Sequence, residues 1–144
     1  MGVMMTTRIT LFHWEIEFER EKTISVYSSI TPGCNCAYCR NFVAATRTLP
    51  PAYFALLDRL GIDPGKPAEI IEHGKNRDGL HRYNWWYHVV GRVLWENETN
   101  ASFANGQVEV LVSSKTDLVD KAFPLPVFQI GFYANLPWVL QEKP

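Results

Sequence analysis

The chain has 144 residues, of which 47% are hydrophobic, and this fits a single domain over residues 1–144 whose core can fold without disulfides or a metal. The formal net charge of -1, with both signs mixed along the chain, lacks the concentrated positive field that binding to nucleic acid requires. No apolar run is long enough to span a bilayer and MGVMMTTRIT lacks a signal peptide core, so we expect a cytoplasmic protein that binds neither nucleic acid nor membrane.

Two alternating runs open the predicted secondary structure. From Phe12 to Phe18, aromatic and aliphatic residues alternate with polar and charged ones, which predicts a half-buried strand. The alternation resumes from Ile24 to Ile30 and ends at Pro32 and Gly33. We therefore predict that these two runs pair as an antiparallel hairpin.

The next segment has the period of helices. Apolar residues at helical spacing predict a helix from Ala37 to Thr48, which Pro50 and Pro51 would stop. A second helix is expected to begin near Pro51, with Gly61 as its C-terminal cap. Together these two helices form a compact insert.

The remainder of the chain is rich in β-forming residues. Four segments have the pattern of strands, the second of them covered on both faces: Ala68 to Glu72, Leu80 to Trp95, Val108 to Val112, and Phe128 to Phe132. Residues 97–106 and 113–126 are expected to be loops. The sum predicts an α+β fold, a mostly antiparallel sheet of about five strands with the two-helix insert packed on one face.

All three cysteines, Cys34, Cys36 and Cys39, lie within six positions of the chain. They occupy a turn that leads into a helix N-terminus, where the helix dipole stabilises thiolates. Zn²⁺ takes four sulfur or nitrogen ligands, and this spacing could deliver three of them. The cluster therefore suggests a structural zinc site, and we place His88 as the fourth ligand.

Two other interpretations of the cysteine cluster stay open. In the first, the thiols are reduced and hold no metal, and Cys39 packs as a small hydrophobic residue. In the second, the protein is a thiol-dependent enzyme in which Cys39 is the nucleophile and His88 or His81 is the base. The sequence leaves open whether the protein is an enzyme.

An aromatic stretch lies in the predicted central strand. Trp85, Trp86 and Tyr87, with His81 nearby, could form the floor of a ligand pocket. Consecutive large aromatic residues in a central strand are also typical of a core that covers both faces of a sheet. An exposed strand edge would in addition be compatible with a homo-oligomer.

Three motifs, CNCAYCRNF, LGIDPGKPAEI and GLHRYNWWYHVVG, together resemble a group of small uncharacterised bacterial proteins that carry them in this order. The resemblance spans Gly33 to Gly91. It implies a bacterial or phage origin and a shared site around the cysteines, and it supplies no catalytic residues because the group has no established activity. We therefore expect a binding or scaffold module with a cysteine turn that holds zinc, with the thiol enzyme as the alternative.

Overall fold

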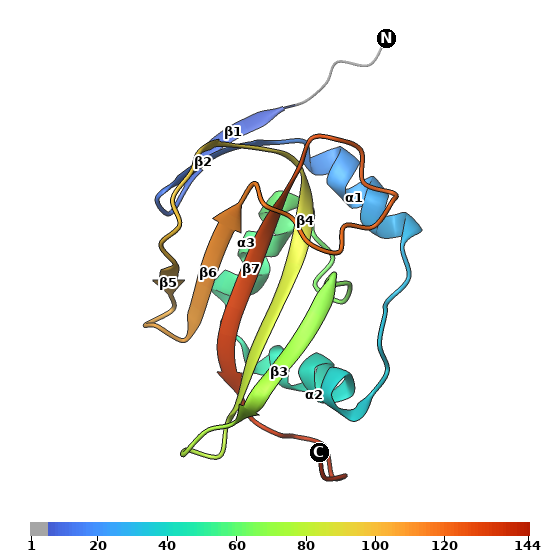
Figure 1. Cartoon of the computed structure of the whole chain (residues 1–144), viewed down its shortest axis with the longest axis vertical. Coiled ribbons are helices and arrows are strands. Elements are labelled where there is room, and N and C mark those ends of the chain that lie inside the picture. The colour runs from blue at the N-terminus through green and yellow to red at the C-terminus, as the bar shows by residue number, and fades with distance from the viewer. Residues whose placement is uncertain (1–5) are drawn as a thin grey trace.

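The computed structural model describes residues 6–144, and the first five residues, which belong to the stretch that argues against a signal peptide, lie outside the described part. The described helices are α1 (Arg20–Ser29), α2 (Ala37–Ala45) and α3 (Pro51–Leu60), and a short 3-10 helix, η1 (Thr46–Thr48), follows α2. The strands are β1 (Thr7–Leu11), β2 (Trp14–Phe18), β3 (Glu69–Lys75), β4 (His81–Trp95), β5 (Ala101–Phe103), β6 (Val108–Ser113) and β7 (Val127–Leu136). The predicted α+β fold is confirmed (Figure 1).

The strands form one antiparallel sheet in the order β1-β2-β4-β7-β6-β5, and β3 pairs with β4. The described sheet therefore has seven strands and not about five. The two strands that the sequence did not predict are β1 and β5. Both are short; β1 is largely exposed and β5 is half-buried, so they lack the buried alternation that marks most of the other strands.

The long strand β4 organises the sheet because its two halves have different partners. Residues 81–86 pair with β3, and residues 91–95 pair with β2 on the same edge. Gly91 lies at this change of partner with a φ of 152°, and a Cβ atom there would collide with the Glu17 carbonyl oxygen. Only glycine lets the backbones of β2 and β4 approach so closely.

The core lies between the sheet and the helices. Phe42 of α2 and Tyr53 of α3 both contact Trp85 of β4, with ring centroids 4.9 Å and 6.0 Å apart, so the two-helix insert covers one face of the sheet. The buried polar atoms are paired there: the Trp85 indole donates to the Tyr53 hydroxyl at 2.9 Å. The Tyr87 hydroxyl lies 2.8 Å from that of Tyr53 and donates to the Pro64 carbonyl.

The expected helices of the insert are confirmed. The segment from Ala37 to Thr48 forms α2 and η1, and Pro51 is the first residue of α3. Gly61 caps α3 in the left-handed conformation, with a φ of 82°.

The predicted strand from Ile24 to Ile30 is wrong, because this segment belongs to helix α1. Between its pairings with β3 and β2, the edge of β4 has backbone groups without a strand partner. Side chains of α1 form hydrogen bonds with these groups. The Tyr27 hydroxyl donates to the carbonyl of His88 at 2.8 Å, and the Val90 amide donates to the Thr23 hydroxyl at 3.1 Å. Four residues span about 6 Å along a helix but about 13 Å along a strand, so only the helix matches the separation of about 7 Å between His88 and Val90 on β4. Tertiary contacts therefore override the alternation.

The predicted hairpin also has a different partner. The chain reverses at Phe12 and His13, and Phe12 has a φ of 55°, so Phe12 lies in a turn and not in the strand. β2 pairs with β1 on one side and with β4 on the other. The alternation from Trp14 to Phe18 was interpreted correctly as a strand, but its hairpin partner precedes it.

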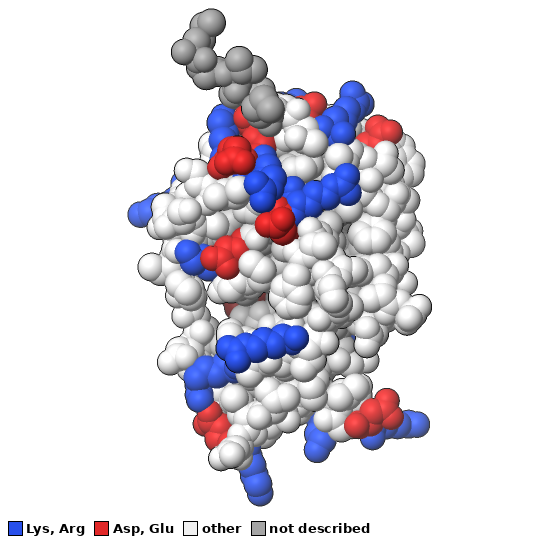
Figure 2. All heavy atoms as spheres, turned by 180° about the vertical axis from the view of Figure 1, so that it is seen from behind, with Lys and Arg blue, Asp and Glu red and all other residues white. Residues whose placement is uncertain are grey.

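The surface carries both charges. On the face that Figure 2 shows, which is the back of Figure 1, positively and negatively charged side chains are intermixed and form no continuous basic surface. Among the described residues, no helix combines the length and apolar content that a membrane crossing takes.

Candidate metal centre

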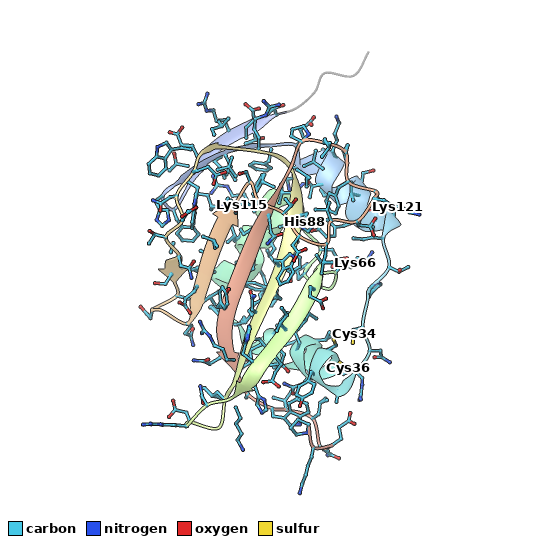
Figure 3. The ribbon with its side chains drawn as sticks, in the orientation of Figure 1. Cys34, Cys36, Lys66, His88, Lys115 and Lys121 are labelled. Carbon is cyan, nitrogen blue, oxygen red and sulfur yellow. The ribbon has the colours of Figure 1, made fainter. Side chains whose placement is uncertain are left out.

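The three cysteines converge at the start of α2. Their Sγ atoms all lie within 4.8 Å of one another, and Figure 3 shows Cys34 and Cys36 together where the segment after α1 enters α2. The local fold explains the convergence. Cys36 is the N-cap residue of α2, and its backbone N–H donates to the Cys34 sulfur at 3.3 Å. Cys39 lies in the first helical turn, which brings it back to the same side.

Arg40 braces this turn from the outside. Its Nε donates to the Asn35 carbonyl at 3.2 Å, and its guanidinium forms an ion pair with Glu142 near the C-terminus. The brace ties the backbone between Cys34 and Cys36 to α2. The cysteine turn is thus held in place by contacts that do not involve the sulfurs.

Asn41 anchors α2 on its buried side, a role that no pattern in the sequence indicates. Its side-chain amide is fully buried, donates to the Tyr83 hydroxyl at 3.3 Å and the Pro137 carbonyl at 3.1 Å, and accepts from the Val139 amide at 2.7 Å. These bonds join α2 to β4 and to the C-terminal segment. They fix the helix on which Cys39 lies.

The three thiols differ in exposure and therefore in acidity. Cys34 and Cys36 are exposed, whereas Cys39 is buried. The pKa of Cys36 is lowered to about 7, first by the hydrogen bond with the Cys34 thiol and then by the backbone of Cys39. Burial raises the pKa of Cys39, and the other two cysteines raise it further. Cys36 therefore forms a thiolate more readily than Cys39 does.

The geometry fits a single thiophilic ion. Zinc bound to thiolates at about 2.3 Å in a tetrahedron holds the sulfurs about 3.8 Å apart. Sulfurs that already lie within 4.8 Å of one another need only small side-chain adjustments to reach that arrangement. Among residues 6–144, no histidine, aspartate or glutamate joins this group, so the described chain supplies three ligands.

The histidines singled out by the sequence lie elsewhere. His88 is buried in β4, its Nε2 is 3.0 Å from the Gln129 Oε1, and Figure 3 shows it well away from Cys34 and Cys36. His81 is also buried, with its Nδ1 3.7 Å from a Glu72 carboxylate oxygen. The structure therefore brings neither imidazole into the sulfur group, either as a ligand or as a base for Cys39.

The aromatic stretch of β4 belongs to the interior. Trp85 and Tyr87 are fully buried in the core, and Trp86 is buried on the opposite face, where its indole donates to the Asp117 carbonyl at 3.1 Å. His81 packs against Trp138 with ring centroids 5.2 Å apart. These side chains pack against protein on both faces of the sheet, as a central strand requires.

The structure adds a feature that the sequence did not indicate, a cavity of about 90 Å³ beside the cysteine turn. Cys34 and Cys39 line it on one side, and Ala68 and Ile70, at the start of β3, line it on the other. A second cavity of about 220 Å³, lined by Lys66 and His88 among others, adjoins the first. No spacing in the sequence predicts that the start of β3 returns to the cysteines.

Burial of His88 has a consequence for stability. Desolvation lowers its pKa below the ordinary value of 6.5, although Gln129 and Asp117 act in the opposite direction. Below about pH 6.5 the unfolded chain therefore binds a proton that the folded chain does not bind. We expect His88 to cause no change in the free energy of unfolding above about pH 6.5. As the pH decreases below that value, His88 should lower the free energy of unfolding by up to about 1.4 kcal/mol per pH unit.

Urea denaturation between pH 7 and pH 5 tests this expectation. In His88→Gln the decrease in the free energy of unfolding should be shallower than in the wild type, because the titrating group is gone. His73→Ala, at an exposed position on β3, is the matched control and should retain the wild-type slope. Equal slopes in His88→Gln and the wild type would show that His88 does not titrate differently in the two states.

Comparison with known protein families, with curated proteins and with solved structures found no match. The inference of function therefore depends on the geometry of the site, which is a surface turn with three convergent cysteines beside a small cavity.

Proposed function

We propose that this protein binds one thiophilic metal ion, Zn²⁺, through Cys34, Cys36 and Cys39, and acts as a binding or scaffold module. The observation that carries the proposal is the convergence of the three sulfurs to within 4.8 Å. The ion would fasten residues 30–36, which run between α1 and α2, to the first turn of α2. Metal would then order a segment of the surface and not the core.

The chemistry of the donors supports zinc. Thiolates are soft ligands that select Zn²⁺, Cu⁺ and similar ions over hard cations. The N-terminus of α2 favours negative charge at Cys36, and a bound cation would favour the thiolate at Cys39 despite its burial. Two exposed thiols give an ion access from solvent.

Two of the motifs that carry the resemblance to small bacterial proteins meet at this place. The cavity is lined by Cys34 and Cys39 from the first motif and by Pro67, Ala68 and Ile70 from the second. Their meeting supports a shared site around the cysteines as part of the proposal.

The alternative, an enzyme with Cys39 as nucleophile, has less support. Cys39 is buried and its thiol pKa is raised, whereas a nucleophilic thiol needs access and a lowered pKa. Within the described residues neither His81 nor His88 joins the sulfurs. The features of a reactive thiol fall on Cys36, which is the residue best placed to bind an ion from solvent.

Metal analysis tests the proposal. Protein purified under reducing conditions without chelators, then incubated with zinc and freed of excess, should carry about one zinc per chain. Cys36→Ser should carry well below this amount, because serine is a poor zinc ligand. Asn35→Ala, in the same turn but outside the sulfur group, is the matched control and should retain the metal. A wild-type chain that retains no more zinc than Cys36→Ser would refute the proposal.

A further inference from the structure

The proposed ion lacks a fourth ligand within the described chain. Zinc is almost always four-coordinate, and a centre with three protein ligands keeps its last position for water or for a ligand from outside. Among residues 6–144 the sulfur group holds only the three cysteines. The nearest carboxylate in the cavity wall, that of Glu69, accepts a hydrogen bond from the Ile70 amide at 3.0 Å. It is thus occupied by the backbone of its own strand.

The sulfur group borders the cavity of about 90 Å³, because Cys34 and Cys39 form part of its wall. A water molecule takes about 30 Å³ in the liquid, so the cavity has room for a few non-hydrogen atoms. Phe42, Val43 and Ile70 form an apolar part of the wall, beside polar residues such as Thr46 and Glu69. The described lining includes no lysine, arginine or histidine, so an anionic group there would find no cationic partner.

We propose that the fourth coordination position opens into this cavity and takes the sulfur of a small thiol, an inference that rests on the proposed metal centre. The thiol would replace a water molecule: R–SH and the ion with its bound water give the ion with bound R–S⁻, one free water and one released proton. The negative charge of the thiolate is taken up by the metal bond, so no protein cation is needed. The apolar part of the cavity wall suits the carbon atom that is bonded to the sulfur of the thiol.

A thiol fits these features better than a hard ligand does. Three thiolates make the ion soft, and a soft ion prefers a further sulfur over a carboxylate oxygen. The volume of about 90 Å³ should favour a thiol with an unbranched group next to the sulfur over one with a branched group.

Cobalt-substituted protein provides the test, because Co²⁺ takes the place of Zn²⁺ and has visible and near-ultraviolet absorption. Loading should first produce the sulfur-to-cobalt charge-transfer band that three thiolates give. Titration with 2-mercaptoethanol should then raise this band by roughly a third, in a saturable manner, as a fourth sulfur joins three. Gel filtration after the titration must show that the cobalt is still bound to the protein.

A substitution that fills the cavity should separate thiol binding from metal binding. Ala68→Leu is expected to bind cobalt as the wild type does but to bind 2-mercaptoethanol at least about tenfold more weakly. Ala52→Leu makes the same change at an exposed position of α3 and is the matched control. If Ala68→Leu does not fold, the wild type serves instead: tert-butyl thiol should bind at least about tenfold more weakly than 2-mercaptoethanol.

The outcomes distinguish the two proposals. Absence of a charge-transfer band on loading refutes the metal centre and this inference with it. A normal band that 2-mercaptoethanol leaves unchanged refutes the inference alone, since an internal ligand or a firmly held water then fills the fourth position. A molar absorptivity per bound cobalt that rises with protein concentration in the absence of thiol also refutes it, because the fourth ligand then comes from a second copy of the chain.

Discussion

Zinc at about one hundred times its dissociation constant should stabilise the folded protein by about 2.7 kcal/mol, which raises the melting temperature by roughly 10 °C for a chain of this size. The reason is mass action: the folded chain holds the three sulfurs within 4.8 Å of one another, so zinc should bind that state preferentially. Calorimetry of the chelator-treated protein, with and without added zinc, measures the shift.

The same experiment has two matched variants. Cys36→Ser should show almost no shift, and Asn35→Ala should show the shift of the wild type. The chelator-treated wild type should still unfold cooperatively, because Cys34 and Cys36 are exposed and lie outside the core. A shift of equal size in Cys36→Ser would mean that zinc stabilises the protein through other groups.

Gly91→Ala should destabilise the protein by more than about 3 kcal/mol. The added Cβ would lie against the carbonyl of Glu17 and the Cα of Phe18, and both contacts are with backbone that cannot rotate away. The φ of 152° is in addition a conformation that alanine avoids. The pairing of β2 with the second half of β4 should therefore be lost or distorted.

Urea denaturation gives the free energy of unfolding for this comparison. Gly33→Ala is the matched control, because a Cβ atom there meets nothing within 4 Å. Its stability should lie within about 0.5 kcal/mol of the wild type. A Gly91→Ala protein with a stability close to that of Gly33→Ala would show that the sheet can shift to accept the extra methyl group.

Much of the fold could be predicted from local sequence patterns. The helical period after Cys36, stopped by Pro50 and Pro51, predicted α2 and α3 because those signals act within a few residues. The apolar run of β4 predicted a strand covered on both faces for the same reason.

The predictions were wrong where contacts between distant parts of the chain determine the secondary structure. The segment of α1 has the alternation of a strand, but its Thr23 and Tyr27 are needed at helical spacing to satisfy the edge of β4. β1 was not predicted because a short exposed edge strand carries almost no pattern. The hairpin that contains it therefore received the wrong partner.

For the candidate site, as for the fold, the local features could be predicted and the long-range ones could not. Proximity of Cys34, Cys36 and Cys39 follows from their spacing at a helix start, which is a local property. The fourth ligand was assigned to His88 only by its position in the aromatic strand, and the structure pairs that imidazole with Gln129. The cavity depends on the meeting of α2 with the start of β3, which no short-range signal encodes.

The two-sided pairing of β4 has a consequence for motion. Its peptide groups are engaged by β3, β2 and α1 along one edge and by β7 along the other, so hydrogen exchange there requires the whole sheet to open. The cysteine turn is not part of the sheet and is held by single contacts, such as the bond from Arg40 to the Asn35 carbonyl. Hydrogen exchange should therefore be slower at the amides of β4 than at those of residues 33–36, and binding at the proposed metal centre would not require the sheet to open.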